Sequence, residues 1–265
     1  MSKSILSAIT LLLSLAAPVL MATPVTFSYG DFSSTAGLTI NGDAAQAGNV
    51  LRLVPSSVAQ SGTAYQTTAV PLDATTGFST SFEFLVTTDA GDPTDGFTFL
   101  LQNDTTAGAN ALGAAGQGLG YVGISPSVAV VFRGRGPSFI GVITGGIDPA
   151  DPSINFNPPG SVALSEGAFY NTKQFAWIDY NPSTMLLSVY LGDSSVKPGS
   201  AIMSTTVDVF GTLGNQAHVG FSAGNGGAFG SQDILNWSFT SVPEPATLSL
   251  LMMGVFSIIS RRRKI

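Results

Sequence analysis

Residues 78–86 read Phe-Ser-Thr-Ser-Phe-Glu-Phe-Leu-Val, a run in which large apolar residues alternate with small or polar ones. Successive side chains of a β-strand point to opposite faces, so this period of two predicts a strand that is buried on one side. The residues expected on the buried side are Phe78, Phe82, Phe84 and Val86. After a loop, residues 96–101 (Gly-Phe-Thr-Phe-Leu-Leu) are expected to form the neighbouring strand.

Other short apolar segments follow, separated by turns rich in Gly, Pro, Asn and Asp. Strands are predicted at residues 127–132, 139–143, 174–180, 185–191, 218–222 and 234–240. The first two of these are almost uniformly apolar, which predicts deeper burial. Asn181-Pro-Ser-Thr184 predicts a hairpin turn. Many short strands without helical periodicity between them predict an all-β sandwich, whose loop-rich ends are the expected place for function.

The composition excludes several classes of protein. Of the 265 residues only 10% are charged, against about 25% in typical soluble proteins, and cysteine is absent. Residues 23–241 contain five of the ten basic residues and 15 of the 16 acidic ones, which gives this stretch a net charge of −10. Such an acidic chain lacks the basic patch of a nucleic-acid binder. The absence of cysteine excludes a disulfide framework and a thiolate metal site.

The two ends of the chain differ from this middle part. Residues 1–22 combine Lys3, an apolar run over residues 5–20 and the small residue Ala22, which predicts a secretory signal peptide. An N-terminal membrane anchor is the alternative. These features assign residues 23–241 to a single β-sandwich domain and residues 242–265 to a separate C-terminal signal.

The C-terminal signal consists of three parts in order. Val242 precedes Pro243-Glu244-Pro245, a mostly apolar run of 14 residues follows at 246–259, and the basic cluster is Arg261, Arg262, Arg263 and Lys264. The run is shorter than the roughly 20 residues of a comfortable membrane span. This arrangement closely resembles the PEP-CTERM sorting signal of Gram-negative bacteria. The resemblance implies a short hydrophobic helix held transiently in the inner membrane, recognition by an exosortase, and delivery to the cell surface or an exopolysaccharide matrix. A plain tail anchor is the alternative.

Two hydrolase motifs are incomplete in this sequence. Residues 220–224 fit the Gly-x-Ser-x-Gly pattern of a nucleophile elbow, but the only histidine, His218, precedes the serine instead of following it. Residues 23–241 contain only two glutamates, Glu83 and Glu166, and they form no compact pair of the kind that glycosidases use. A glycosidase that uses aspartates alone stays open as a less favoured alternative.

Asp89, Asp92 and Asp95 are spaced by three residues in one short loop. Clustered carboxylates suit Ca²⁺, although the ligand pattern of an EF-hand is missing. The sequence leaves a non-standard calcium site at Asp89 and Asp92 and a simple solvated turn as open alternatives.

The order of these landmarks resembles a legume-type (L-type) lectin, which folds as a concanavalin-like jelly-roll sandwich. The matching segments are residues 78–84, 94–99, 116–121, 128–132, 219–223 and 233–241. By this resemblance Asp95 would accept hydrogen bonds from sugar hydroxyls, and a backbone N–H at Gly116 or Gly118 would donate to the sugar. The fourth loop, with Asn225, Gly226 and Gly227, would donate from its backbone. The resemblance also implies a cis peptide bond between Thr94 and Asp95.

The sequence departs from the family where the family binds Mn²⁺ and Ca²⁺. The family's acidic pair corresponds to Val131 and Arg133, and its metal-binding histidine corresponds to Phe139. The loop between them is shortened to residues 134–138, so no metal cofactor is expected. One hypothesis is that Arg133 and Arg135 replace the metal charge and pair with Asp95 or Asp92. The alternative is that both arginines are simply exposed.

Taken together, these observations predict an exported, non-catalytic protein that binds carbohydrate, with an exopolysaccharide as its expected partner. The competing prediction is a structural surface or biofilm matrix protein that keeps the lectin fold without sugar binding. A glycoside hydrolase of the same sandwich class is a third possibility.

Overall fold

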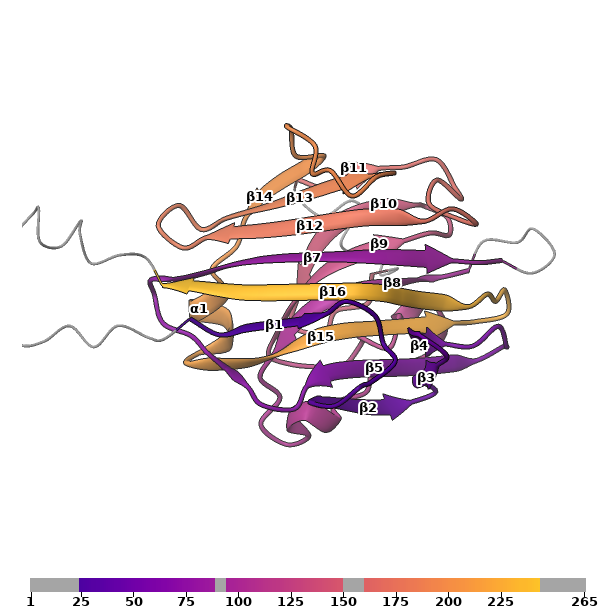
Figure 1. Cartoon of the computed structure of the whole chain (residues 1–265), viewed down its shortest axis with the longest axis horizontal. Coiled ribbons are helices and arrows are strands. Elements are labelled where there is room, and N and C mark those ends of the chain that lie inside the picture. Colours follow the sequence, from indigo (N-terminus) through magenta and orange to yellow (C-terminus); the bar gives the residue numbers. More distant parts are fainter. Residues whose placement is uncertain (1–23, 89–93, 150–159, 244–265) are drawn as a thin grey trace, which may run out of the picture. The chain divides into compact units, whose positions relative to one another are not determined.

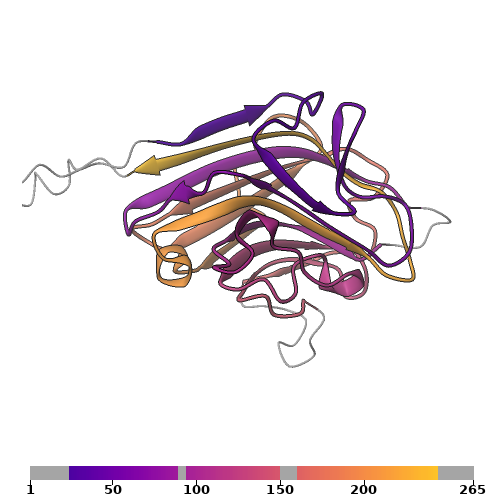
Figure 2. The same cartoon turned by 90° about the horizontal axis from the view of Figure 1, so that it is seen from below.

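The computed structural model describes residues 24–88, 94–149 and 160–243, and these form two antiparallel β-sheets stacked as layers (Figures 1 and 2). The first sheet has the order β14-β13-β12-β7-β16-β4-β3, with β1 paired to β16. Its strands are β1 (Thr26–Tyr29), β3 (Ala45–Ala47), β4 (Val50–Val54), β7 (Thr76–Val86), β12 (Gln174–Asn181), β13 (Leu186–Gly192), β14 (Met203–Thr206) and β16 (Gln232–Pro243).

The second sheet has the order β11-β10-β9-β8-β15-β5-β2, and β6 pairs with β15. Its strands are β2 (Leu38–Gly42), β5 (Gln60–Gln66), β6 (Val70–Pro71), β8 (Gly96–Gln102), β9 (Ser127–Arg133), β10 (Phe139–Thr144), β11 (Val162–Ala163) and β15 (Gln216–Asn225). The helical pieces among the described residues are the 3-10 turns η1 (Gly108–Asn110) and η2 (Gly116–Gly118) and one short helix, α1 (Val209–Leu213). The predicted all-β sandwich is therefore confirmed.

The main core lies between the two sheets and is dominated by phenylalanine. The Phe82 ring of β7 packs against rings of the second sheet, with centroids 6.1 Å from Phe99 and 5.0 Å from Phe221. A second apolar cluster covers the other face of the second sheet, where the segment 107–124 folds over it. Because of this cover, every residue of β8 and β9 is buried, as the apolar sequence of residues 127–132 predicts.

Most predicted strands are present, and each starts within one residue of its predicted start or extends further. These are the strands predicted at residues 78–86, 127–132, 139–143, 174–180, 185–191, 218–222 and 234–240. The hairpin turn is also present, with the Thr184 N–H donating to Asn181 Oδ1 at 3.1 Å. The prediction that residues 96–101 neighbour residues 78–86 in one sheet is wrong. The loop after Val86 carries the chain to the opposite sheet, so β8 pairs with β9 and β15 and meets β7 across the core.

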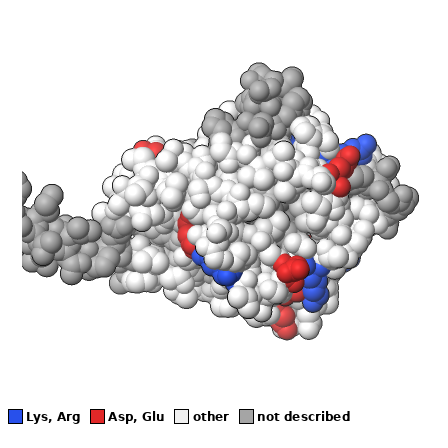
Figure 3. All heavy atoms as spheres, turned by 90° about the horizontal axis from the view of Figure 1, so that it is seen from above, with Lys and Arg blue, Asp and Glu red and all other residues white. Residues whose placement is uncertain are grey.

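Charged side chains are sparse on the face shown in Figure 3, where most of them lie in small groups that contain both signs. Arg52 makes a bidentate ion pair with Asp233, and both N···O distances are 2.8 Å. Lys173 pairs with Glu83 at 3.1 Å, so Glu83 lies on the outer face of the first sheet, and Lys197 pairs with Asp179. Each of these three basic residues is thus paired with an acidic residue.

Several predicted segments lie outside the described residues. These are the signal peptide at residues 1–22, Asp89 and Asp92 of the calcium alternative, and the sorting segment from Glu244 onward, including Pro245, Arg261, Arg262 and Arg263. Pro243 is the last residue of β16. In the described part of the chain, no helix has the length and apolar character needed to cross a membrane.

Candidate functional site

The predicted site residues gather at one end of the sandwich, where several strands begin or end. β7 and β15 end there with Val86 and Asn225, β9 ends with Arg133, and β8 begins with Gly96. This is the end to which the arrowheads of β7 and β15 point in Figure 1. β16 runs the other way, so its last residue, Pro243, lies at the opposite end of the sandwich.

Asp95 lies directly before β8, and only 8% of it is exposed. Its carbonyl accepts a hydrogen bond from the Gly134 N–H at 3.0 Å, and its carboxylate accepts one from the Gly226 N–H. Burial raises the pKa of the Asp95 carboxyl above its usual value, while this N–H, Arg133 and Arg135 act in the opposite direction. A carboxylate has about four acceptor positions, so Asp95 keeps capacity for further donors.

Two glycines, Gly116 and Gly226, lie beside this carboxylate. A Cβ on Gly226 would lie 3.0 Å from Asp95 Oδ2, and a Cβ on Gly116 would lie 3.9 Å from the same atom. Gly116 also has a φ of +61°, which residues with a side chain rarely adopt. Gly118 differs, because its N–H already donates to Ala115 O at 3.2 Å. Of the two predicted glycines, the structure therefore brings Gly116 and not Gly118 to Asp95.

The fourth loop was predicted to donate from its backbone, and its residues differ in exposure. Gly227 is exposed, with no heavy atom within 4 Å of where a Cβ would lie. The Asn225 side chain, in contrast, is fully buried. Its amide donates to the carbonyls of Pro55 and Gly230 at 2.8 and 2.9 Å, and its oxygen accepts from Thr94 Oγ1. The Asn225 side chain thus holds the loops together and is not available to a ligand.

Two features that fix the position of Asp95 were not predicted from the sequence. Gln232 Nε2 donates to the Asn225 amide oxygen at 3.2 Å, which adds β16 to the buried network of Thr94 and Asn225. The Tyr170 hydroxyl donates to the Thr94 carbonyl at 2.6 Å. Burial, reinforced by the charge of Asp95, raises the pKa of Tyr170, so the phenol stays protonated as a donor. Tyr170 lies far from Asp95 in the sequence and belongs to no recognisable motif, so no sequence signal identifies it.

Arg133 and Arg135 differ sharply in exposure. Arg133 is 4% exposed, and its Nε donates to Arg135 O at 2.9 Å, while Arg135 itself is exposed. The alternative of two exposed arginines is therefore wrong for Arg133. Neither arginine forms an ion pair with a described carboxylate, although both act on Asp95 through their charge. The hypothesis of a direct contact with Asp95 is not met, and Asp92 lies outside the described residues.

The predicted cis bond between Thr94 and Asp95 is wrong, since the cis peptide bonds of the described residues are Ser125–Pro126 and Gly136–Pro137. A cis bond before a residue other than proline costs about 2.5–4 kcal/mol. With the trans bond, the Asp95 carboxylate still reaches the Gly226 N–H.

The Gly-x-Ser-x-Gly motif at residues 220–224 lies within strand β15. Ser222 is fully buried in β15, and its Oγ lies 2.7 Å from Thr98 Oγ1. His218 Nδ1 lies 3.0 Å from the Gln66 carbonyl, at the start of the same strand. These contacts agree with a structural role for both residues.

The residues at the family's metal positions do not fit a divalent cation. Val131 and Phe139 are buried in the second apolar cluster, and Arg133 carries a permanent positive charge. Within residues 24–88, 94–149 and 160–243, no three His, Cys, Asp or Glu side chains lie close enough together to hold a metal ion.

Removal of divalent cations is therefore expected to leave the folded domain unchanged. A metal that binds only the native state would stabilise it by mass action, so stripping it would lower the melting temperature. We expect the same melting temperature in EDTA as in buffer with Mn²⁺ and Ca²⁺, measured by differential scanning calorimetry. A clear fall in EDTA would contradict the absence of a metal site.

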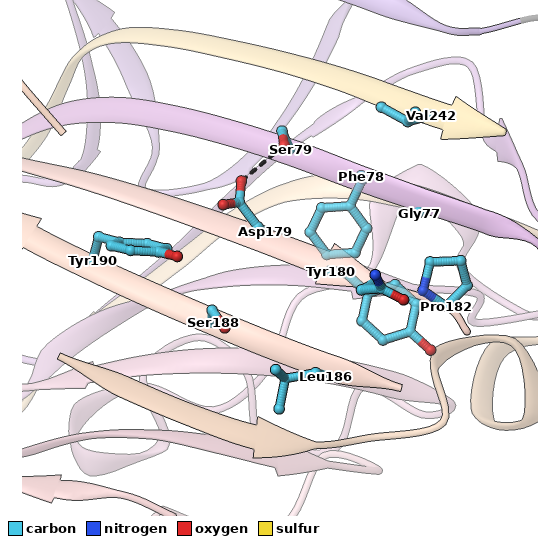
Figure 4. A pocket seen from close by; sticks show the side chains of 11 residues that line it. Gly77, Phe78, Ser79, Asp179, Tyr180, Pro182, Leu186, Ser188, Tyr190 and Val242 are labelled. Atoms are coloured by element: carbon cyan, nitrogen blue, oxygen red, sulfur yellow. Dashed lines mark hydrogen bonds between the residues drawn. The ribbon is translucent and has the colours of Figure 1, made fainter. Parts of the chain in front are cut away.

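A separate pocket of about 280 Å³ lies on the first sheet, beside β7, β12 and β13 (Figure 4). Its polar group Asp179 already accepts a hydrogen bond from Ser79 at 2.7 Å and pairs with Lys197. The Tyr190 ring in this pocket has the Lys197 ammonium 4.1 Å from its centroid. The pocket contains none of the predicted site residues.

Comparison with known families gives two matches. The legume lectin domain matches residues 24–131 and 153–250, and the PEP-CTERM protein-sorting motif matches residues 241–264. Together they cover the C-terminal signal and the β-sandwich apart from residues 132–152, which include β10.

Individual relatives are plant proteins. Lectin 10 of Medicago truncatula is 27% identical over 247 residues, which cover 82% of this chain and 83% of the relative. The L-type lectin-domain containing receptor kinase S.6 of Arabidopsis thaliana is 33% identical over 172 residues, 63% of this chain but only 24% of that protein. Among solved structures, a lectin from Bauhinia forficata in complex with GalNAc superposes with a TM-score of 0.67 at 21% identity, covering 84% of this chain and all of that one.

Proposed function

Because the chain belongs to the legume lectin domain family, we propose that it binds carbohydrate at the loops around Asp95. The observation that carries this proposal is the buried Asp95 carboxylate, held between the backbones of Gly116 and Gly226 with acceptor capacity left over. Two relatives cited above are named as lectins, and one of them is a complex with GalNAc.

The chemistry of the site suits sugar hydroxyls. A hydrogen bond from a hydroxyl to an ionised carboxylate is roughly twice as strong as one between neutral groups. The absence of side chains on Gly116 and Gly226 lets a sugar ring approach the backbone. The exposed Gly227 offers further backbone at the rim. Asp95 would fix the orientation of the sugar, and the glycines would allow its approach.

The second part of the proposal concerns destination and ligand. The PEP-CTERM motif supports export, a transient stay in the inner membrane through residues 246–259, and processing by an exosortase. The protein would then act at the surface or in the matrix of a Gram-negative cell. An exported carbohydrate-binding protein meets the exopolysaccharide of its own cell first, so this polymer is the proposed ligand.

A glycan array that includes the exopolysaccharide of the producing cell tests the function. The proposal expects binding to at least one glycan without release of reducing sugar. Binding to none would favour a structural matrix protein that keeps the fold alone. Release of reducing sugar would instead favour a glycoside hydrolase.

Saccharide binding is expected to weaken as the pH is lowered. The loss should begin at a higher pH than it would if Asp95 had the usual pKa of an aspartate. Only the ionised Asp95 is a full acceptor, and burial raises its pKa above the usual value near 3.9. For stability the sign is opposite, because a raised pKa in the folded state makes protonation of Asp95 favour folding. Affinity measured by calorimetry from pH 7 downward should therefore fall before the domain unfolds. Affinity that stays constant until unfolding would contradict a role for Asp95.

A further inference from the structure

The end of β9 places a positive charge one strand away from Asp95. Arg133 is the register partner of Gly96 on β8, the residue that follows Asp95, and of Phe139 on β10. Arg133 is 4% exposed, whereas Arg52 in the first sheet is only partly buried. Burial of a charge is costly unless the structure compensates for it.

The guanidinium is bonded to the backbone of its own loop. Nε donates to Arg135 O at 2.9 Å, and Nη2 reaches Gly136 O at 3.5 Å. The loop is closed by Ser138 Oγ, which donates to Gly134 O at 2.6 Å, and the Gly134 N–H donates to Asp95 O. Arg133 and Asp95 are therefore both hydrogen-bonded to the backbone of the same short loop.

The charges around the guanidinium come from several elements. Asp95 precedes β8, Asp148 lies in the β10–β11 loop, and the Tyr170 hydroxyl lies against Gly134. Glu166 accepts from the Gly136 N–H at 3.3 Å, and the exposed Arg135 adds a second positive charge. Burial lowers the pKa of Arg133, and Asp95 opposes this shift most strongly among its neighbours. A guanidinium nevertheless stays charged in proteins.

The contacts of Arg133 do not optimise stability. Among the residues that the structure describes, its buried Nη1 has no hydrogen-bond partner, whereas Arg52 binds both oxygens of Asp233. A buried charged donor without an acceptor costs free energy, and an apolar side chain of similar size is often at least as stable in such a place. The presence of an arginine at this buried position is thus better explained by its charge, which favours the ionised form of the Asp95 carboxylate.

We propose that the buried Arg133 guanidinium is a built-in cation that holds the 134–138 loop and keeps the Asp95 carboxylate ionised and in position. Arg133 is a positioning residue, and Asp95 is the residue that would touch the sugar. This inference deepens the proposed function, but its main test needs no saccharide.

The test is the titration of the Asp95 carboxyl, followed by carbon-13 NMR of the side chain in the full-length protein. Arg133→Met should raise the midpoint, since loss of a nearby positive charge disfavours the ionised carboxylate. Arg133→Lys keeps a positive charge and should give a smaller shift of the Asp95 midpoint. This variant replaces Arg133→Met in the test if the methionine variant does not fold. Arg52→Met is the matched control, because it removes an arginine that pairs with Asp233 in the other sheet. It should lower stability and leave the Asp95 midpoint unchanged.

A midpoint unchanged in both Arg133 variants would overturn the inference, even if the protein binds saccharide. A raised midpoint in a protein that binds no glycan would support the inference and contradict the proposed function. If both hold, Arg133→Met should also bind the array-selected glycan at least ten times more weakly than Arg52→Met does.

Discussion

Replacement of Asp95 by asparagine is expected to weaken saccharide binding by about 10- to 100-fold. Asparagine keeps the size of the side chain but loses the charge and exchanges one acceptor for a donor. Hydrogen bonds to charged groups contribute about 1.5–3 kcal/mol, and each 1.4 kcal/mol is about tenfold in affinity. Isothermal titration calorimetry with the array-selected glycan measures the loss.

The matched control for this change is Asp193→Asn, which removes the same charge from an exposed position in the β13–β14 loop. It should leave affinity unchanged, and thermal melting should show that both variants are folded. Equal affinity in Asp95→Asn and wild type would remove Asp95 from the binding site.

The second large effect is expected in the core, where Phe82→Ala should lower the free energy of unfolding by about 3–5 kcal/mol. Phe82 is 1% exposed, and its ring meets Phe97, Phe132 and Phe221 across the sandwich with centroids 5.0–6.3 Å apart. Alanine would leave a cavity among these rings. Because domains of this kind are stable by only about 5–15 kcal/mol, this loss is a large share of the total. Urea unfolding followed by tryptophan fluorescence measures it.

Leu186→Ala serves as the control for the core variant, since Leu186 is 38% exposed on β13. Its expected cost is about 0.5 kcal/mol, as for most surface changes. A loss below about 1 kcal/mol for Phe82→Ala would mean that the core does not depend on this ring. If the alanine variant does not fold, Phe82→Leu should show the same direction with a smaller size.

The strands with a strong apolar pattern were predictable from sequence, and the others were not. In β7 the alternation of Phe82, Glu83 and Phe84 maps directly onto one buried and one outer face. β3 reads only Ala-Gln-Ala, and no apolar pattern marks its limits. Alternation also does not encode the partner of a strand, which is why β8 was expected beside β7 although it lies across the core from it.

At the site, local motifs located some residues but not the tertiary contacts that hold them. Asp95 and Gly116 follow from short segments that resemble a known family, and the structure brings them together. The bond from Thr94 to Asn225 joins residues 131 positions apart, and no spacing rule reveals it. The burial of Arg133 depends on how a five-residue loop folds back over its own strand, which composition and charge do not indicate.

We propose that the chain binds carbohydrate at Asp95, with an arginine and no metal ion behind the site. The decisive measurement is a crystal structure of the protein with its array-selected glycan, grown in the presence of Mn²⁺ and Ca²⁺. We expect a sugar hydroxyl within hydrogen-bonding distance of the Asp95 carboxylate, the ring against Gly116 and Gly226, and no metal density beside Arg133. A sugar bound elsewhere, such as in the pocket of Figure 4, or a metal ion at the end of β9, would contradict it.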